Sequence, residues 1–249
     1  VAVGNNIGIS ITAFTISGDS ADNYYLTQPT GITAGIYNDY IAAQGTDYMV
    51  NSNDWLNEDF VITAADGYSL SATNAADGNW TSSLSASDEL SDGTLEFYVK
   101  NNTTGAISVL KTESYKIDKT APAGEISIGE NKWREFLNTI TFGYFFKDTQ
   151  IITIDSEDAL SGISKVEYAV SDKALSLEEV QNLPDWTEGS SVNVTPEDGK
   201  QFICYVRITD NVGNVAYLST DGAEYDLTAP VISGISDGAT YCISAEFKV

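Results

Sequence analysis

Residues 201–210 read QFICYVRITD, and DNVGN (210–214) follows directly. Apolar residues recur at every second position of the first stretch, which is the pattern of a half-buried β-strand. The second stretch is rich in Asn, Asp and Gly, which favour a tight turn between antiparallel strands. These fourteen positions therefore predict one strand of a β-hairpin and its turn.

The same alternation recurs along the chain, and turn-forming clusters separate the segments. Such clusters are AADG (64–67), SDG (91–93) and EDG (197–199). Their spacing is typical of antiparallel hairpins, so the predicted fold class is all-β. The other segments predicted as strands are 9–17, 59–66, 94–100, 150–156 and 165–171.

One segment predicts a helix. In SLEEVQNL (176–183), Ser176 can cap the first turn and Glu179 can reach back to complete a capping box. Pro184 follows, and proline cannot continue a helix. We therefore expect a short helix near 176–183.

An internal repeat defines the organisation of the chain. YKIDKTAP (115–122) recurs as YDLTAP (225–230), so Asp118 and Asp226 lie 108 residues apart. The strands upstream of each copy match at a nearly equal offset. A repeated unit of about a hundred residues has the size of an immunoglobulin-like β-sandwich with Greek-key antiparallel sheets. The proline stiffens the junction, because it fixes its own φ and biases the preceding residue to an extended conformation.

The repeat predicts four parts. Residues 1–36 form a partial repeat, 37–118 a first sandwich, 119–227 a second sandwich, and 228–249 the start of a third. The second sandwich carries an insertion, REFLNTITFGYFFKD (134–148), which we expect to form an extra hairpin or a bent edge segment.

The composition excludes several functions. The chain has 249 residues, 12 Lys and Arg, 36 Asp and Glu, and a net charge of −24. Nucleic acids and anionic membrane surfaces would be repelled by such a charge, so neither is an expected partner. The apolar runs are too short for a membrane-spanning helix. Cys204 and Cys242 lie in apolar alternating runs and are expected to be small buried hydrophobes.

Catalysis is not expected. The chain contains no His, which excludes Ser-His-Asp, Cys-His and His-metal sites. Adjacent carboxylates such as Glu157 and Asp158, or Glu178 and Glu179, diverge on a strand or helix and make poor acid–base pairs. We therefore predict that the chain is not an enzyme and needs no cofactor, with calcium as the one candidate ion.

A calcium site is one alternative for the turns. Hard cations take several oxygen ligands from carboxylates and carbonyls. The candidate ligands form one group that includes a residue at each junction. However, D-N-x-G-N is also a stable turn by itself, and an Asp before T-A-P can bond neighbouring amides, so a purely structural role is favoured. The candidates are Asp210, Asn211, Asn214, Asp226 and Asp118.

Tryptophans are the other candidates for a binding role, because an exposed ring can stack on a sugar or anchor a protein. Trp80 and Trp186 occupy matching positions of the repeat, which favours packing. Trp55 and Trp133 lie near the start of each sandwich and are the candidate ligand contacts, although a structural role is again favoured.

The junctions also carry a resemblance to a known family. YKIDKTAP, YDLTAP and DNVGN resemble the bacterial Ig-like repeats of large surface proteins of Gram-positive bacteria, over about residues 37–249. Residues 3–36 are similar to the C-terminal half of a YDG-type repeat. The residues at its signature positions are Gly18, Asp22, Asn23, Tyr24 and Pro29.

The resemblance implies an extracellular, non-catalytic role at the cell surface or wall. We expect a monomeric stalk or adhesive segment that spaces or presents a binding region and contacts neighbouring Ig-like modules of its own chain, with host glycan or protein as candidate partners. The alternative is a carbohydrate-binding module that accompanies a catalytic domain elsewhere in the parent protein. A hydrolase is the least favoured third hypothesis.

Overall fold

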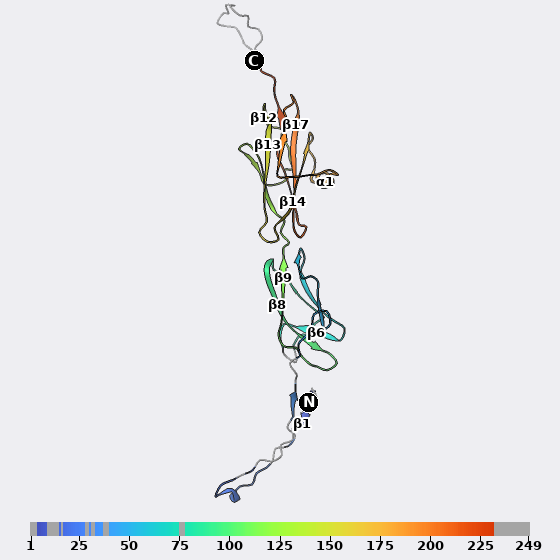
Figure 1. Ribbon diagram of the computed structural model, residues 1–249, viewed down its shortest axis with the longest axis vertical. Helices are drawn as coiled ribbons and strands as arrows, with labels where there is room; N and C mark the ends of the chain where they lie inside the picture. The colour runs from blue at the N-terminus through green and yellow to red at the C-terminus, as the bar shows by residue number, and fades with distance from the viewer. Residues whose placement is uncertain are drawn as a thin grey trace, which may run out of the picture. The chain divides into compact units, whose positions relative to one another are not determined.

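The computed structural model describes residues 4–8, 15, 17–27, 30, 33–36, 40–74 and 78–231 (Figure 1). The chain divides into two compact units, Val1–Lys119 (unit 1) and Thr120–Val249 (unit 2). The described residues of both units form mainly antiparallel β-sheets. The predicted all-β, sandwich-type fold class is therefore confirmed.

Two sheets make up the sandwich of unit 1. In one sheet β5 lies between β3 and β7, and in the other β8 and β9 form the centre, where they run side by side (Figure 1). A separate pair, β1 (Gly4–Gly8) and β2 (Thr33–Ile36), and a 3-10 turn, η1 (Ala21–Asn23), precede this sandwich. The sandwich strands are β3 (Tyr48–Val50), β4 (Trp55–Leu56), β5 (Phe60–Ala64), β6 (Tyr68–Ser71), β7 (Ser83–Ala86), β8 (Leu90–Asn101) and β9 (Lys111–Ile117).

The core of unit 1 fills the space between these sheets. Phe97 of β8 is fully buried, and its ring meets that of Tyr48 edge-on at 5.0 Å between centroids. Phe60 stacks on Tyr115 at 5.4 Å. The alternation of apolar residues in the sequence thus corresponds to the inward faces of the strands.

Unit 2 has a second sandwich with its own core. One sheet has the order β11-β10-β13-β16 and the other the order β12-β19-β17-β14-β15, with β18 paired to β17. The chain crosses between the sheets after β13 and again on either side of β16, as in Greek-key sandwiches. The strands are β10 (Ala123–Ile128), β11 (Asn131–Trp133), β12 (Tyr144–Phe146), β13 (Gln150–Glu157), β14 (Ile163–Ser171), β15 (Thr187–Glu188), β16 (Ser191–Val194), β17 (Gln201–Asp210), β18 (Val215–Ser219) and β19 (Ala223–Tyr225).

The helix α1 (Leu177–Gln181) forms with the predicted cap. The Ser176 hydroxyl accepts the backbone N–H of Glu179, and the Glu179 carboxylate accepts the backbone N–H of Ser176 at 2.8 Å. Val180 is the buried residue of the helix and packs with Ile203 and Tyr205 on the outer face of β17. The helix therefore covers a small second core outside the sandwich.

The insertion forms no hairpin within 134–148. Its first part is irregular and packs over the same second core, where the ring of Phe136 stacks on Tyr205 at 6.1 Å. The backbone N–H and the hydroxyl of Thr141 both donate to the Asp221 carboxylate, at 2.6 and 2.5 Å. The insertion then continues into β12, which pairs in parallel with β19. Of the two predicted forms, the bent edge segment is the observed one, because distant residues of β17 and β19 hold it.

The predicted strands at 94–100, 150–156, 165–171 and 201–210 all lie within observed strands, and 59–66 contains β5. Most of 9–17 lies outside the described residues, as do Pro29 of the YDG-type signature and most of the third unit expected at 228–249.

Candidate functional site

The turn after β17 is built around a buried aspartate. Asp210 is only 1 % exposed. One carboxylate oxygen accepts the backbone N–H groups of Val212 and Asn214 at 2.9 and 2.8 Å, and the other accepts the Asn214 side-chain amide at 2.7 Å. Gly213 supplies the left-handed conformation that the turn needs, with φ of 93°. Both carboxylate oxygens are therefore used to shape the turn itself.

A second loop lies beside this turn. Asp158 Oδ1 accepts the backbone N–H groups of Leu160 and Gly162 at 3.1 and 2.6 Å. The Asn211 side-chain amide donates to the Ser161 carbonyl at 2.7 Å and joins the two loops. The sheet register causes this meeting, because the loop leads into β14, and Ile163 at the start of β14 pairs with Asp210.

Asp158 and Asp210 form a close pair of carboxylates, with one oxygen of each within 4.8 Å of the other. Sequence reasoning considered Asp158 only as a catalytic partner of Glu157 and missed this position. The signal was its place in the turn between two predicted strands. Oxygen ligands of this kind suit a hard cation, which takes six to eight of them. The hydrogen bonds above account for the loop geometry without an ion.

The five predicted calcium ligands are not brought together as one group. Asp210, Asn211 and Asn214 share the turn after β17, and the Asn214 amide also donates to the Thr120 carbonyl at 3.3 Å. Asp226 lies beside the start of β17, which has 10 residues and separates it from Asp210 by about 30 Å. Antiparallel pairing causes this separation, because β19 enters at one end of β17 and the turn leaves at the other.

The two junction aspartates occupy matching places in their own units. Asp118 follows β9, and its backbone N–H donates to the Leu56 carbonyl at 2.9 Å. Asp226 follows β19, and its backbone N–H donates to the Phe146 carbonyl at 3.0 Å. Both residues therefore form the last rung of a parallel strand pair, β4–β9 in unit 1 and β12–β19 in unit 2.

We expect Asp210→Ala to lower the free energy of unfolding of unit 2 by about 2 kcal/mol, because it removes three hydrogen bonds to a buried charged acceptor. The loss should be the same in calcium and in EDTA when urea unfolding is followed. Asp185→Ala, a change at an exposed carboxylate, is the control. A calcium-dependent rise in wild-type stability that disappears in Asp210→Ala would instead establish a cation site.

The two candidate tryptophans take part in packing. Trp133 meets the Tyr144 ring edge-on at 5.5 Å and packs against the core of unit 2. Trp55 lies half-buried in β4, with Lys116 Nζ 5.9 Å from its ring centroid. Both tryptophans are half-buried, and the binding role of each stays a prediction.

Trp80 and Trp186 each contact a cationic side chain, and the two cations occupy matching positions of the two units. Lys100 Nζ lies 4.6 Å from the Trp80 ring centroid, and Arg207 Cζ lies 4.6 Å from that of Trp186. Such cation–π contacts favour a fixed ring position. The equivalence read from the sequence thus extends to a pair of side chains, which supports the packing role predicted for both tryptophans.

In unit 2 the cation that contacts the tryptophan, Arg207, also takes part in a buried ion-pair network. Glu167 is 4 % exposed, and its carboxylate meets Arg207 Nη2 at 2.7 Å and Lys165 Nζ at 2.6 Å. Burial acts to raise the pKa of Glu167, but the hydrogen bonds from Lys165 and Arg207 outweigh it and lower this pKa below its ordinary value.

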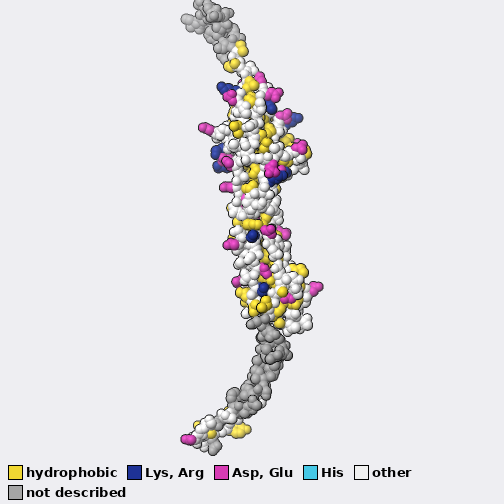
Figure 2. Space-filling model, viewed as in Figure 1, with side chains coloured by type: hydrophobic (Ala, Val, Ile, Leu, Met, Phe, Trp, Pro, Cys, Tyr) yellow, Lys and Arg dark blue, Asp and Glu magenta, His cyan; other side chains and the backbone are white. Residues whose placement is uncertain are grey.

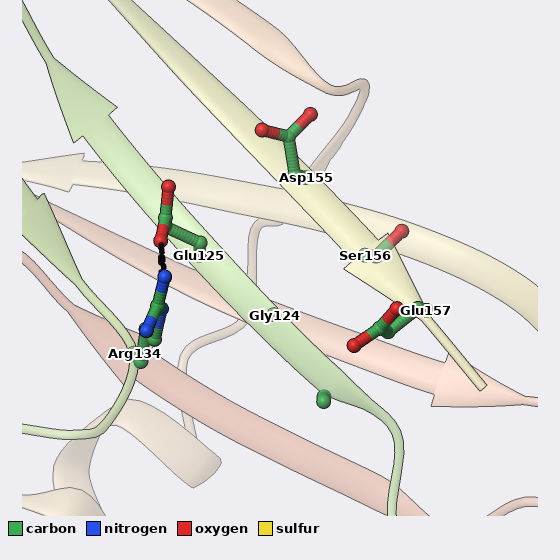
Figure 3. Close-up of a pocket in the computed structure, with 7 residues that line it drawn as sticks. Gly124, Glu125, Arg134, Asp155, Ser156 and Glu157 are labelled. Carbon is green, nitrogen blue, oxygen red and sulfur yellow. Dashed lines mark hydrogen bonds and ion pairs between the residues drawn. The ribbon is translucent and has the colours of Figure 1, made fainter. Parts of the chain in front are cut away.

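An open groove of about 510 Å³ lies over β10 and β13 of unit 2 (Figure 3). Asp155 and Glu157 project from β13 on the same face, and Glu125 stands opposite Asp155. Glu125 pairs with Lys132 and Arg134 at 2.5 and 2.6 Å. Sites for small molecules are mostly apolar with a few polar groups, whereas this groove is lined by charges.

Figure 2 shows acidic side chains scattered over the visible face of both units, with Lys and Arg among them. Among the described residues, no helix is long and apolar enough to cross a membrane.

No protein-family model and no curated protein matches the chain. Solved structures show distant similarity. The fibronectin(III)-like modules of Clostridium thermocellum CbhA match with 10% identity and a TM-score of 0.32, covering 72% of this chain and 94% of that one. Three N-terminal domains of the bacteriophage RB49 outer capsid protein Hoc match with 12% identity and a TM-score of 0.29, covering 72% and 58%. A cytokine receptor complex matches with 16% identity and a TM-score of 0.25, covering 74% and 98%. These scores are too low to carry a functional conclusion.

Proposed function

We propose that this chain is a non-catalytic stalk segment of a bacterial cell-surface protein, which spaces or presents a binding region. Its type is the bacterial Ig-like repeat, preceded by part of a YDG-type repeat, and its location is extracellular. Host protein or glycan is the proposed partner. The strong negative charge supports this role, because it keeps an exposed surface soluble.

The motif that ends each unit is repeated, and this repetition supports the proposal most directly. Each unit has its own core, and the last strand of each ends at an aspartate of the D-x-T-A-P motif whose backbone N–H closes a parallel strand pair. A chain built from such units can be lengthened by repetition without changing any unit, as in other repeat architectures. The aromatic residues support it further, because the rings of Trp80, Trp133 and Trp186 are engaged in internal contacts.

Small-angle scattering of the whole chain tests the stalk role. A compact globule of 249 residues has a radius of gyration of roughly 18 Å. We expect a value well above this and a pair-distance distribution with a long tail. A radius near that of the globule, or turnover in a broad hydrolase screen, would contradict the proposal.

A glycan array separates the stalk from the alternative, a carbohydrate-binding module. Under the stalk proposal, Trp55→Ala leaves any signal unchanged relative to the wild type. Saturable binding that is lost in Trp55→Ala and kept in Trp133→Ala would support the alternative, because the Trp133 ring packs against the core of unit 2.

A further inference from the structure

The chain leaves each unit through D-x-T-A-P, and in both units a carboxylate of the same unit holds the residue at position x. In unit 1 the backbone N–H of Lys119 donates to Glu89 Oε1. In unit 2 the backbone N–H of Leu227 donates to Asp198 Oδ1 at 2.7 Å. Glu89 immediately precedes β8, and Asp198 lies in the turn that precedes β17. The two acceptors therefore come from corresponding places in the two sandwiches.

These contacts begin where the sheet ends. The N–H of the junction aspartate is the last to meet a strand carbonyl, at Leu56 in unit 1 and at Phe146 in unit 2. The next N–H has no strand beside it. A carboxylate is a strong acceptor for such a group, because hydrogen bonds to an ionised partner are roughly twice as strong as neutral ones.

In unit 1 the side chain of position x adds further contacts. Lys119 Nζ forms an ion pair with Asp59 at 2.5 Å and donates to the Ser87 carbonyl at 3.3 Å. Lys119 is therefore tied to its own unit through both its backbone and its side chain.

In unit 2 the threonine of the motif supplies the additional contact. The hydroxyl of Thr228 donates to Asp198 Oδ2 at 2.8 Å, and its backbone N–H donates to Asp226 Oδ1 at 3.2 Å. The hydrogen bonds from the Leu227 N–H and from Thr228 lower the pKa of Asp198 below its ordinary value. In both units a further side-chain contact holds the motif to its own unit, although Lys119 makes it in unit 1 and Thr228 in unit 2.

We infer that these contacts are a latch that fixes the direction in which the chain leaves each unit. The proline of the motif fixes its own φ and restricts the alanine before it, so the threonine is the one motif residue between position x and this restricted pair. Ordering a residue costs conformational entropy, and one hydrogen bond to a charged acceptor can offset a cost of this kind. The latch rests on the proposed stalk function and specifies how such a stalk would resist bending at its junctions.

Removal of the carboxylate in the full chain tests the latch. In Glu89→Ala we expect the ¹⁵N order parameter of Lys119 to fall below about 0.85, the value of a rigid backbone, because its N–H loses its acceptor while only the side-chain contacts remain. Its amide exchange should become at least about tenfold faster, which corresponds to 1.4 kcal/mol. Glu96→Ala removes the same charge from an exposed position of β8 and should leave Lys119 unchanged.

The second latch provides an independent test. Asp198→Ala should release Leu227 in the same way and leave Lys119 unaffected. If Glu89→Ala also exposes the core amide of Ile117, so that unit 1 itself is loosened, the Asp198 variant decides. Unchanged order parameters at both positions would overturn the latch. A compact scattering particle or turnover in the hydrolase screen would overturn the stalk function instead, and neither result depends on these two amides.

Discussion

Phe97→Ala is expected to lower the free energy of unfolding of unit 1 by about 3–5 kcal/mol and to leave unit 2 unaffected. Phe97 is 0 % exposed, and its ring contacts Tyr48 across the core. The substitution leaves a cavity between two sheets that cannot collapse fully. Because domains are typically stable by about 5–15 kcal/mol, a loss of this size removes a large part of the stability of unit 1.

Differential scanning calorimetry and urea unfolding of the full chain can check this, with amide exchange to assign each transition to a unit. The unit 1 transition should move to lower temperature, and the unit 2 transition should stay in place. Met49→Ala is the control, because Met49 also lies in unit 1 but is 56 % exposed, and its loss should cost under about 0.5 kcal/mol. If both transitions shifted together in Phe97→Ala, the two cores would not be independent.

Features set by local sequence could be predicted. The capping box of α1 needs only Ser176 and Glu179, which are three residues apart, and the strand positions follow from side-chain alternation. The repeat identified the equivalence of Trp80 and Trp186 because matching positions in two copies of a fold meet matching surroundings. The turn around Asp210 was likewise expected, since D-N-x-G-N forms its own hydrogen bonds.

Features set by strand register could not be predicted. Asp226 was grouped with Asp210 as a candidate calcium ligand, but β19 joins the opposite end of β17. Asp158 reaches Asp210 only through the pairing of β14 with β17. The insertion was ambiguous because its second part, β12, pairs in parallel with β19, about eighty residues further on. Each outcome depends on non-local pairing, which residue spacing does not reveal.

Arg207→Ala and Lys100→Ala are expected to differ strongly in effect although the two residues occupy matching positions. Glu167 stands opposite Arg207 across the β14–β17 pair, whereas Ser69 stands opposite Lys100 across the β6–β8 pair. Removal of Arg207 leaves a buried carboxylate with one cation, Lys165, whose side chain is 44% exposed.

Breaking a buried ion pair costs about 3–5 kcal/mol, and the retained Lys165 places the expected loss for Arg207→Ala near 3 kcal/mol. Lys100→Ala loses only a cation–π contact with Trp80, so under about 1 kcal/mol is expected. Urea unfolding of the two variants measures both losses directly. Equal losses in the two variants would show that the tryptophan contact, and not the buried carboxylate, determines the effect.

The pH dependence of stability gives a second test of whether the buried Glu167 carboxylate or the tryptophan contact determines the loss in Arg207→Ala. The pKa of Glu167 is lowered in the folded protein, so its contribution is fully present above the unfolded pKa of about 4.3 and is lost as the pH falls through the folded value. Without Arg207 the folded pKa should rise, because burial is then less well opposed. The stability difference between wild type and Arg207→Ala should therefore shrink as the pH falls below about 4, while the difference for Lys100→Ala stays constant. Glu167→Gln in the Arg207→Ala background should recover much of the lost stability at neutral pH, because no buried charge then remains without its main partner.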